Sequence, residues 1–151
     1  MAAPPRILAF AASARRESLN RRFLALAVVA VKEAGGEVTL LDLNDFAMPL
    51  YHGDLEDAQG LPENAVRLIG LIGKHHALLV ASPEYNSMFT PLLKNTVDWC
   101  TRADDNPFEG KVAAVISASG SRRRRASASA NAGSMWPADP PPASNTFMSR
   151  P

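Results

Sequence analysis

The polar segment at residues 13–20 brings together side chains that suit the binding of an anion. It reads Ser-Ala-Arg-Arg-Glu-Ser-Leu-Asn and lies between an apolar run and an amphipathic helical pattern. A helix N-terminus presents unpaired backbone N–H groups and the positive end of the helix dipole, and hydroxyl, amide and guanidinium groups accompany it here. The segment therefore predicts a phosphate site. In the alternative interpretation, Ser18 is only a helix N-cap and the arginines form a solvated face.

Two glycine-rich fingerprints that accompany many phosphate sites are absent. Neither G-x-G-x-x-G nor G-x-x-x-x-G-K-[ST] occurs in the chain. Their absence disfavours a Rossmann-type dinucleotide site and a Walker-type NTPase. A second polar segment, residues 82–87, reads Ser-Pro-Glu-Tyr-Asn-Ser and also follows an apolar run.

Four short apolar runs alternate with helical patterns along the chain. The runs cover residues 7–12, 38–43, 77–81 and 112–117, and each predicts a strand. The runs at residues 7–12 and 77–81 have the composition of strands buried on both faces, as in a parallel sheet. Apolar residues spaced three to four apart predict helices at residues 19–34, 62–74 and 91–102. The alternation predicts an α/β fold with a doubly wound parallel sheet. Both polar segments then lie at carboxyl ends of strands, where such folds bind ligands.

Three motifs, in this order, resemble those of the NADPH-dependent FMN reductase family, flavodoxin-like flavoproteins that include quinone, chromate and azo-dye reductases. Residues 13–20 are similar to its S-x-R-x-x-S-x-N phosphate loop, and residues 83–99 to its P-E-Y-N…P…L-K-N-x-x-D-W signature. Residues 111–119 resemble its next strand and the turn that contacts the flavin. The resemblance covers about residues 6–120. It implies a flavodoxin-like sheet with strand order 2-1-3-4.

The resemblance also implies an FMN site built from three segments. The phosphate would be held by Ser13, Arg15, Ser18 and Asn20. The isoalloxazine ring would be lined by Pro83, Glu84, Tyr85 and Asn86, and its other edge would be approached by Ser117 and Ser119. A planar flavin suits a flat neighbour and hydrogen bonds to its pyrimidine part, whereas its phosphate suits a helix end.

Two places depart from the family pattern. Ala12 stands where a glycine usually precedes the phosphate loop, which adds a methyl group where the backbone is expected to pass close to the ligand. Residues 120–125, which read Gly-Ser-Arg-Arg-Arg-Arg, replace the glycine-rich turn expected after Ser119.

The implied function is that of an FMN-dependent oxidoreductase. NADPH or NADH would reduce the flavin, and the flavin would pass electrons to a small acceptor such as a quinone, azo compound, metal oxyanion or free flavin. Because the cofactor carries the chemistry, no side chain is assigned as catalytic, and no metal is expected. The family also implies a homo-oligomer, either a dimer or a tetramer. The alternative is a flavin-binding or inactive fragment whose basic tail contacts an anionic partner.

The other reactive residue types are expected to be structural. Structural roles are assigned to four residues of the signature, Lys94, Asn95, Asp98 and Trp99. Cys100 is the only cysteine, which excludes an intrachain disulfide, and we expect it to be a buried, inert thiol. His75 and His76 are adjacent and point in different directions on any regular element, so they do not predict a metal pair.

Length and composition indicate one soluble globular domain. The 151 residues are 46% apolar and 21% charged with a net charge of +1, which does not favour nucleic-acid binding. No apolar stretch approaches the roughly 20 residues of a membrane helix, and no signal peptide is evident. We therefore expect a cytoplasmic protein that does not associate with membranes.

Residues 121–151 differ in composition from residues 1–120. They carry a net charge of +4, against −3 for residues 1–120, and five of the twelve prolines. Proline lacks a backbone donor, and the Ala/Ser-rich part has little apolar area to bury. We expect an FMN-binding domain at residues 1–120 and then an irregular tail, with the family's fifth strand missing. The hypothesis for its origin is a shifted reading frame, because glycine codons read out of phase encode arginine.

Overall fold

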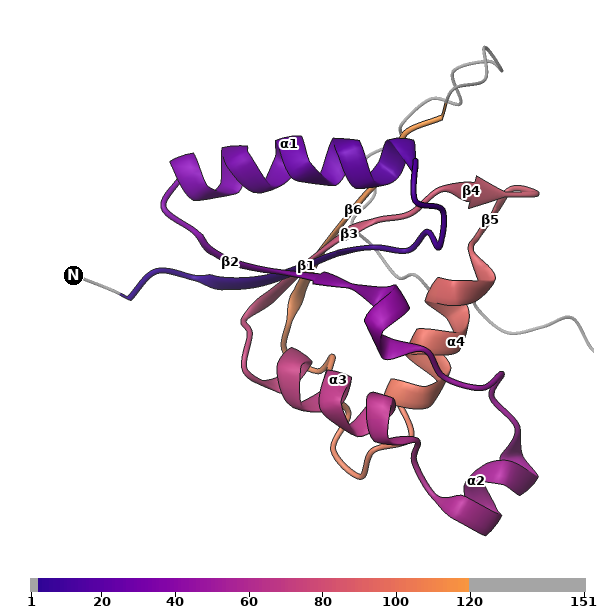
Figure 1. The fold of residues 1–151 in the computed structure, drawn as a ribbon. Coiled ribbons are helices and arrows are strands. Elements are labelled where there is room, and N and C mark those ends of the chain that lie inside the picture. Colours follow the sequence, from indigo (N-terminus) through magenta and orange to yellow (C-terminus); the bar gives the residue numbers. More distant parts are fainter. Residues whose placement is uncertain (1–2, 120–151) are drawn as a thin grey trace, which may run out of the picture. The chain divides into compact units, whose positions relative to one another are not determined.

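The computed structural model describes residues 3–119, and every structural statement below refers to this part of the chain. Its elements follow the expected α/β alternation (Figure 1). In chain order they are β1 (Arg6–Ala11), α1 (Leu19–Glu33), β2 (Glu37–Asp42), the 3-10 helix η1 (Leu43–Phe46), α2 (Gly53–Gln59), α3 (Glu63–Gly73), β3 (Ala77–Ala81), β4 (Glu84–Tyr85), β5 (Met88–Phe89), α4 (Pro91–Cys100) and β6 (Val112–Ile116).

The main sheet has four parallel strands in the order β2-β1-β3-β6. This order confirms the expected order 2-1-3-4, because β6 is the fourth of the predicted strands. The chain moves outward from β1 in one direction to β2 and in the other direction to β3. The winding therefore reverses beside β1, which makes the carboxyl ends of β1 and β3 the expected ligand edge.

Helices cover both faces of the sheet, α1 on one side and α3 with α4 on the other (Figure 1). The core beneath α1 consists of Ile7, Ala9, Ala11, Leu24, Val28, Leu79 and Ala81. The opposite core consists of Leu8, Phe10, Ala12, Leu43, Phe46, Leu68, Ile72, Leu78, Val80 and Cys100. From Ile7 onward, successive residues of β1 enter the two cores in turn, so this part of the strand is apolar rather than alternating with polar residues.

Three short elements, η1, α2 and the β4–β5 hairpin, are absent from the sequence prediction. Helix α2 has no buried residue and so lacks apolar periodicity, and His52 Nδ1 caps it by accepting a hydrogen bond from Asp54 N at 3.2 Å. The hairpin turns at Asn86 and Ser87, whose φ angles of 54° and 64° are both left-handed. Two such residues form the type I′ turn that suits a hairpin, but the usual glycine signal is absent here.

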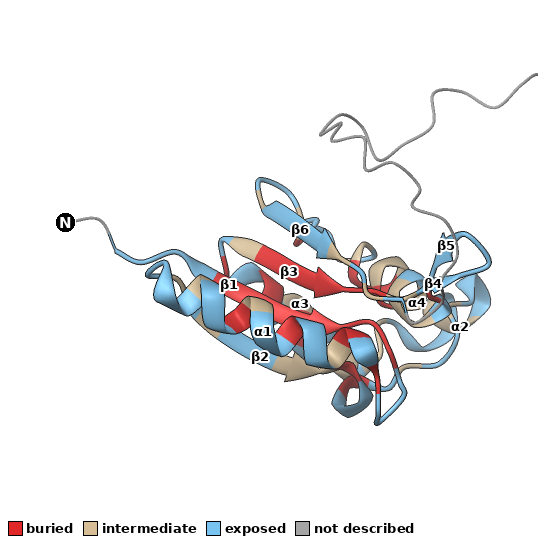
Figure 2. Ribbon diagram, turned by 90° about the horizontal axis from the view of Figure 1, so that it is seen from above, coloured by how far each residue is buried: buried red, intermediate tan, exposed pale blue. Residues whose placement is uncertain are grey.

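Strand β6 contrasts with the rest of the sheet (Figure 2). Its residues are exposed except for Ile116, which is half-buried.

The expectations for residues 121–151, namely the irregular tail, the missing fifth strand and the shifted frame, lie outside the described residues. No helix within residues 3–119 is both long and apolar enough to span a bilayer.

Candidate functional site

A cavity of about 290 Å³ opens at the carboxyl ends of β1, β3 and β6. Three segments that are far apart in the chain form its walls: the β1–α1 loop, the residues that follow β3, and the residues that follow β6. The lining residues are Ser13, Arg15, Glu17, Ser18, Leu19, Asn20, Pro83, Glu84, Tyr85, Ala118 and Ser119. The cavity therefore lies at the edge that the topology marks for a ligand.

The cavity brings together all but two of the residues that the family resemblance implies. Asn86 and Ser117 belong to the same segments but do not line it. Glu17, Leu19 and Ala118 do line it, although no sequence motif selects them. Their only available signal was position, since each stands directly beside an expected site residue.

Ser18 lies at the N-cap position of α1, but its side chain makes no capping hydrogen bond. Only its backbone oxygen is used by the helix, accepting from Arg22 N at 3.3 Å. Ser18 and Ser13 are both buried, with 6% and 3% of their surfaces exposed. The Ser18 hydroxyl therefore does not cap the helix, whereas Arg15 and Arg16 are exposed, as the alternative of a solvated face expects.

The charges around the β1–α1 loop favour an anion. Among residues 3–119, Arg15 forms no ion pair, so its guanidinium is not committed to another part of the fold. The one acidic residue of the loop, Glu17, is paired with Arg22 at 2.8 Å, and both side chains are largely exposed. The pairing offsets the negative charge beside the α1 N-terminus, where a phosphate is most favoured.

The second wall follows β3 and leads into the β4–β5 hairpin. Ser82 N donates to Ile116 O at 2.9 Å, which continues the β3–β6 ladder, and Ser82 Oγ donates to Pro83 O at 3.0 Å. Beyond this point Tyr85 is 45% exposed, opposite Met88 on the other strand of the hairpin. An exposed aromatic ring beside a cavity offers a flat surface to a planar ligand.

The Ala12 methyl group does not obstruct the cavity. Ala12 is fully buried and belongs to the core on the α3–α4 side. Its oxygen accepts from the hydroxyl of Thr90 at 2.9 Å, and the same hydroxyl accepts from Leu93 N at 3.2 Å as the cap of α4. Ala12 therefore packs into the core and is not among the residues that line the cavity.

Asn20 connects the first and third walls. Its Nδ2 donates to Ala118 O at 3.0 Å, and its Oδ1 accepts from Ala118 N at 2.9 Å. The residue is 3% exposed and lies in the first turn of α1. The two hydrogen bonds join segments 98 residues apart in the chain.

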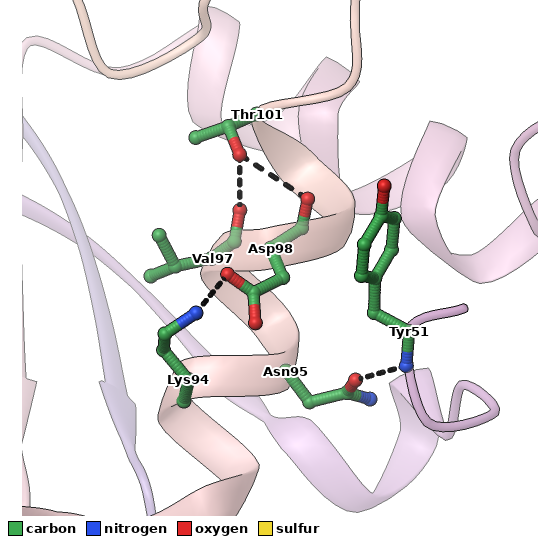
Figure 3. A network of polar contacts seen from close by, with 6 residues as sticks. All are labelled: Tyr51, Lys94, Asn95, Val97, Asp98 and Thr101. Atoms are coloured by element: carbon green, nitrogen blue, oxygen red, sulfur yellow. Dashed lines mark hydrogen bonds and ion pairs between the residues drawn. The ribbon is translucent and has the colours of Figure 1, made fainter. Parts of the chain in front are cut away.

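The signature residues on α4 have the structural roles expected of them. Asn95 Oδ1 accepts from Tyr51 N at 2.8 Å (Figure 3), and its Nδ2 donates to Pro49 O at 2.9 Å. The buried Trp99 donates from Nε1 to the same Pro49 oxygen at 2.8 Å and packs edge-on against Tyr51, with ring centroids 5.1 Å apart. Lys94 and Asp98 form an ion pair on the outer side of the helix (Figure 3). Asn95 and Trp99 therefore hold the loop before α2 against α4.

Cys100 is confirmed as a buried thiol. It is fully enclosed in the core on the α3–α4 side, and burial raises its pKa from 9.0 to about 12. A thiol of this kind stays protonated and is a poor nucleophile. Within residues 3–119, no three His, Cys, Asp or Glu side chains are grouped so that they could hold a metal ion.

The parallel sheet of order β2-β1-β3-β6, with helices on both faces and a cavity at its carboxyl edge, defines an α/β flavodoxin-like fold. The sequence model of the NADPH-dependent FMN reductase family matches residues 5–137, and the chain belongs to this family.

Relatives and solved structures agree with this assignment. An NAD(P)H-dependent FMN reductase of Pseudomonas aeruginosa is 37% identical over 117 residues, which are 78% of this chain and 61% of that protein. An NAD(P)H:quinone oxidoreductase of Solanum tuberosum is 34% identical over 124 residues, 80% of this chain and 62% of that protein. The chain thus spans about three fifths of the length of these relatives.

Among solved structures, the flavoenzyme NAD(P)H:(acceptor) oxidoreductase FerB from Paracoccus denitrificans has a TM-score of 0.60 at 34% identity, with 75% of this chain and 60% of that chain covered. An NAD(P)H:quinone oxidoreductase from Methanothermobacter marburgensis has a TM-score of 0.61 at 21% identity, with 76% and 66% covered, and shows the same fold.

Proposed function

We propose that this chain binds FMN in the cavity and acts as an NAD(P)H-dependent oxidoreductase that reduces a small acceptor. One observation carries the proposal: the three segments that resemble the family's flavin-binding motifs converge on a single cavity at the topological switch point. The Pseudomonas and Solanum relatives are named as enzymes of this type. Quinones, azo compounds, metal oxyanions and free flavin are the acceptor classes we propose.

The residues present fit FMN at both of its ends. The phosphate would lie at the α1 N-terminus, against the hydroxyls of Ser13 and Ser18 and the guanidinium of Arg15. The ring would lie against the second wall, formed by Pro83, Glu84 and Tyr85. Asn86, Ser117 and Ser119 remain proposed neighbours of the ring.

Bound FMN supplies the hydride-accepting and electron-donating chemistry of such an enzyme. The protein's part is to bind the phosphate, present a flat wall and orient the ring through hydrogen bonds. We therefore propose no catalytic acid or base, and either NADPH or NADH as the electron donor. We further propose a cytoplasmic homo-oligomer, dimer or tetramer, and a flavin domain that ends at about residue 120; light scattering of the purified protein tests the oligomeric state.

The visible spectrum of the purified protein tests the proposed function first. A yellow protein with an FMN absorbance band is expected. A colourless protein that takes up no added FMN, and that retains DNA on a column, would favour the alternative of an inactive fragment with a basic tail.

Initial-rate kinetics then test the mechanism. If donor and acceptor use the same flavin face in turn, plots with NADPH and a quinone give parallel lines, the ping-pong pattern. Intersecting lines, with flavin fully bound throughout, would contradict a shared site.

A further inference from the structure

The Asn20 side chain is matched to the backbone of a single residue. A primary amide has an oxygen that accepts and an NH2 group that donates, in the arrangement of a peptide unit, and Asn20 uses its oxygen and one N–H on Ala118, at 2.9 and 3.0 Å. The residue is 3% exposed, so these bonds are shielded from water. Shielded polar pairs are costly to break, because each group would be left without a partner.

The hydrogen bonds between Asn20 and Ala118 hold a segment that lines the cavity. Ala118 and Ser119 form the third wall of the cavity, and they follow β6, the exposed strand of the sheet. Packing therefore contributes little to the direction in which the chain leaves β6. The amide pair supplies that direction from α1, which Leu24 and Val28 anchor in the core beneath it.

We propose that Asn20 is a positioning residue that holds residues 118–119 as the ring-edge wall of the cavity, rather than a ligand of the phosphate. This inference rests on the proposed function and departs from the role that the family resemblance implies for Asn20. The oxygen and one N–H of its amide bond the backbone of Ala118, whereas Arg15, Ser13 and Ser18 make no such bond across the cavity.

The choice of residue type follows from this geometry. An aspartate at position 20 accepts from Ala118 N but places a negative oxygen against Ala118 O, so it keeps one bond and loses the other. An alanine loses both. The series asparagine, aspartate, alanine should therefore release the third wall in two steps.

Titrations with FMN and riboflavin separate positioning from phosphate binding, since riboflavin has the ring but no phosphate. Asn20→Ala should weaken the binding of both flavins by the same factor, about three- to thirtyfold. Arg15→Ala, as the contrasting variant, should weaken FMN alone. If Asn20→Ala weakens FMN and leaves riboflavin unchanged, Asn20 binds the phosphate and the inference is wrong.

Amide hydrogen exchange of the flavin-free protein gives a readout that does not depend on the proposed function. The Ala118 amide should be protected in the wild type, partly protected in Asn20→Asp and unprotected in Asn20→Ala, while the β3 amides stay protected in all three and report an intact fold. Unchanged exchange at Ala118 in Asn20→Ala would overturn the inference. If neither flavin binds the wild type, the proposed function fails, and the exchange result still decides whether Asn20 holds the wall.

Discussion

Strands β3 and β6 are neighbours of equal length and similar composition, yet only one of them is buried. β3 reads Ala-Leu-Leu-Val-Ala and β6 reads Val-Ala-Ala-Val-Ile, and the two pair along their whole length. β3 is buried from its second residue onward, whereas β6 is exposed up to its last residue (Figure 2). Val80 and Val115, which are register partners, are 5% and 58% exposed.

The difference between β3 and β6 separates two properties, strand formation and burial, that an apolar run is often taken to predict together. Apolar, β-branched composition favours an extended strand in both segments. Burial depends on what packs over the strand, and within residues 3–119 helices α1, α3 and α4 cover β1 and β3 far more fully than β6. Within the described chain, β3 therefore forms core, while β6 contributes mainly the backbone that leads to the third wall of the cavity.

The largest expected effect comes from truncating the paired valines. Val80→Ala should lower the free energy of unfolding by about 2 kcal/mol, because it removes two buried methyl groups and leaves a cavity. Val115→Ala is the matched control on the neighbouring strand and should change it by less than about 0.5 kcal/mol. Urea denaturation of both variants makes the measurement. Equal losses would mean that β6 is covered in solution, which would remove the contrast.

The β4–β5 hairpin extends the comparison to another exposed element. Ser87 has a φ of 64°, a left-handed conformation that is unfavourable for a side chain with a Cβ. Ser87→Gly should relieve this strain and raise the free energy of unfolding by about 1 kcal/mol if the hairpin unfolds with the core. Ser87→Ala retains the Cβ and serves as the control, with no gain expected. No gain in either variant would show that the hairpin unfolds separately from the sheet.

The opposite edge of the sheet, β2, ends in an ion pair that β6 lacks. Arg21 Nη2 contacts both carboxylate oxygens of Asp42 at 2.5 and 2.6 Å. Burial raises the pKa of this carboxyl. The hydrogen bond from the Asn44 N–H and the Arg21 guanidinium lower it by more, so the net pKa lies below 3.8.

A carboxyl whose pKa is lower in the folded than in the unfolded chain stabilises the fold at pH values above its unfolded pKa of about 3.9. This stabilisation is lost as the pH falls through the lower pKa of the folded state. Because both side chains are partly exposed, we expect less than about 1 kcal/mol at neutral pH. Asp42→Asn should therefore lose slightly more stability at pH 7 than at pH 2 to 3, relative to wild type. Asp45→Asn, on the adjoining 3-10 helix, is the control for simple loss of charge. A loss that is the same at both pH values would contradict the pairing.

The elements that the sequence predicts are those with an apolar run or a helical spacing of apolar residues, whether the structure buries them, as it does β3, or exposes them, as it does β6. β1 and β3 are continuous apolar runs, and α3 begins directly after Pro62 as expected. The strand order followed from the family resemblance, and the structure confirms it. Two of the three cavity segments were also found, because polar residues after a buried strand stand out from their surroundings, and the third was indicated by the family resemblance.

What the sequence could not predict depends on contacts between distant residues. Nothing local to Asn20 indicates that its amide pairs with Ala118, and nothing in the composition of β6 indicates its exposure. The β4–β5 hairpin was not predicted because its turn uses Asn86 and Ser87 rather than glycine. In each case the deciding interaction is made by another segment or by a backbone conformation that the residue types do not favour.

Flavin titration of an Arg15 and Arg16 variant pair tests the central claim most directly, namely that the α1 N-terminus holds the FMN phosphate. Arg15 lines the cavity, whereas the adjacent Arg16 does not, so the two variants remove the same charge at neighbouring positions. Arg15→Ala should weaken FMN binding about ten- to a hundredfold, and Arg16→Ala should change it less than about threefold. Wild-type protein should bind riboflavin far more weakly than FMN. Equal affinities for FMN and riboflavin, or equal effects of the two substitutions, would contradict this account.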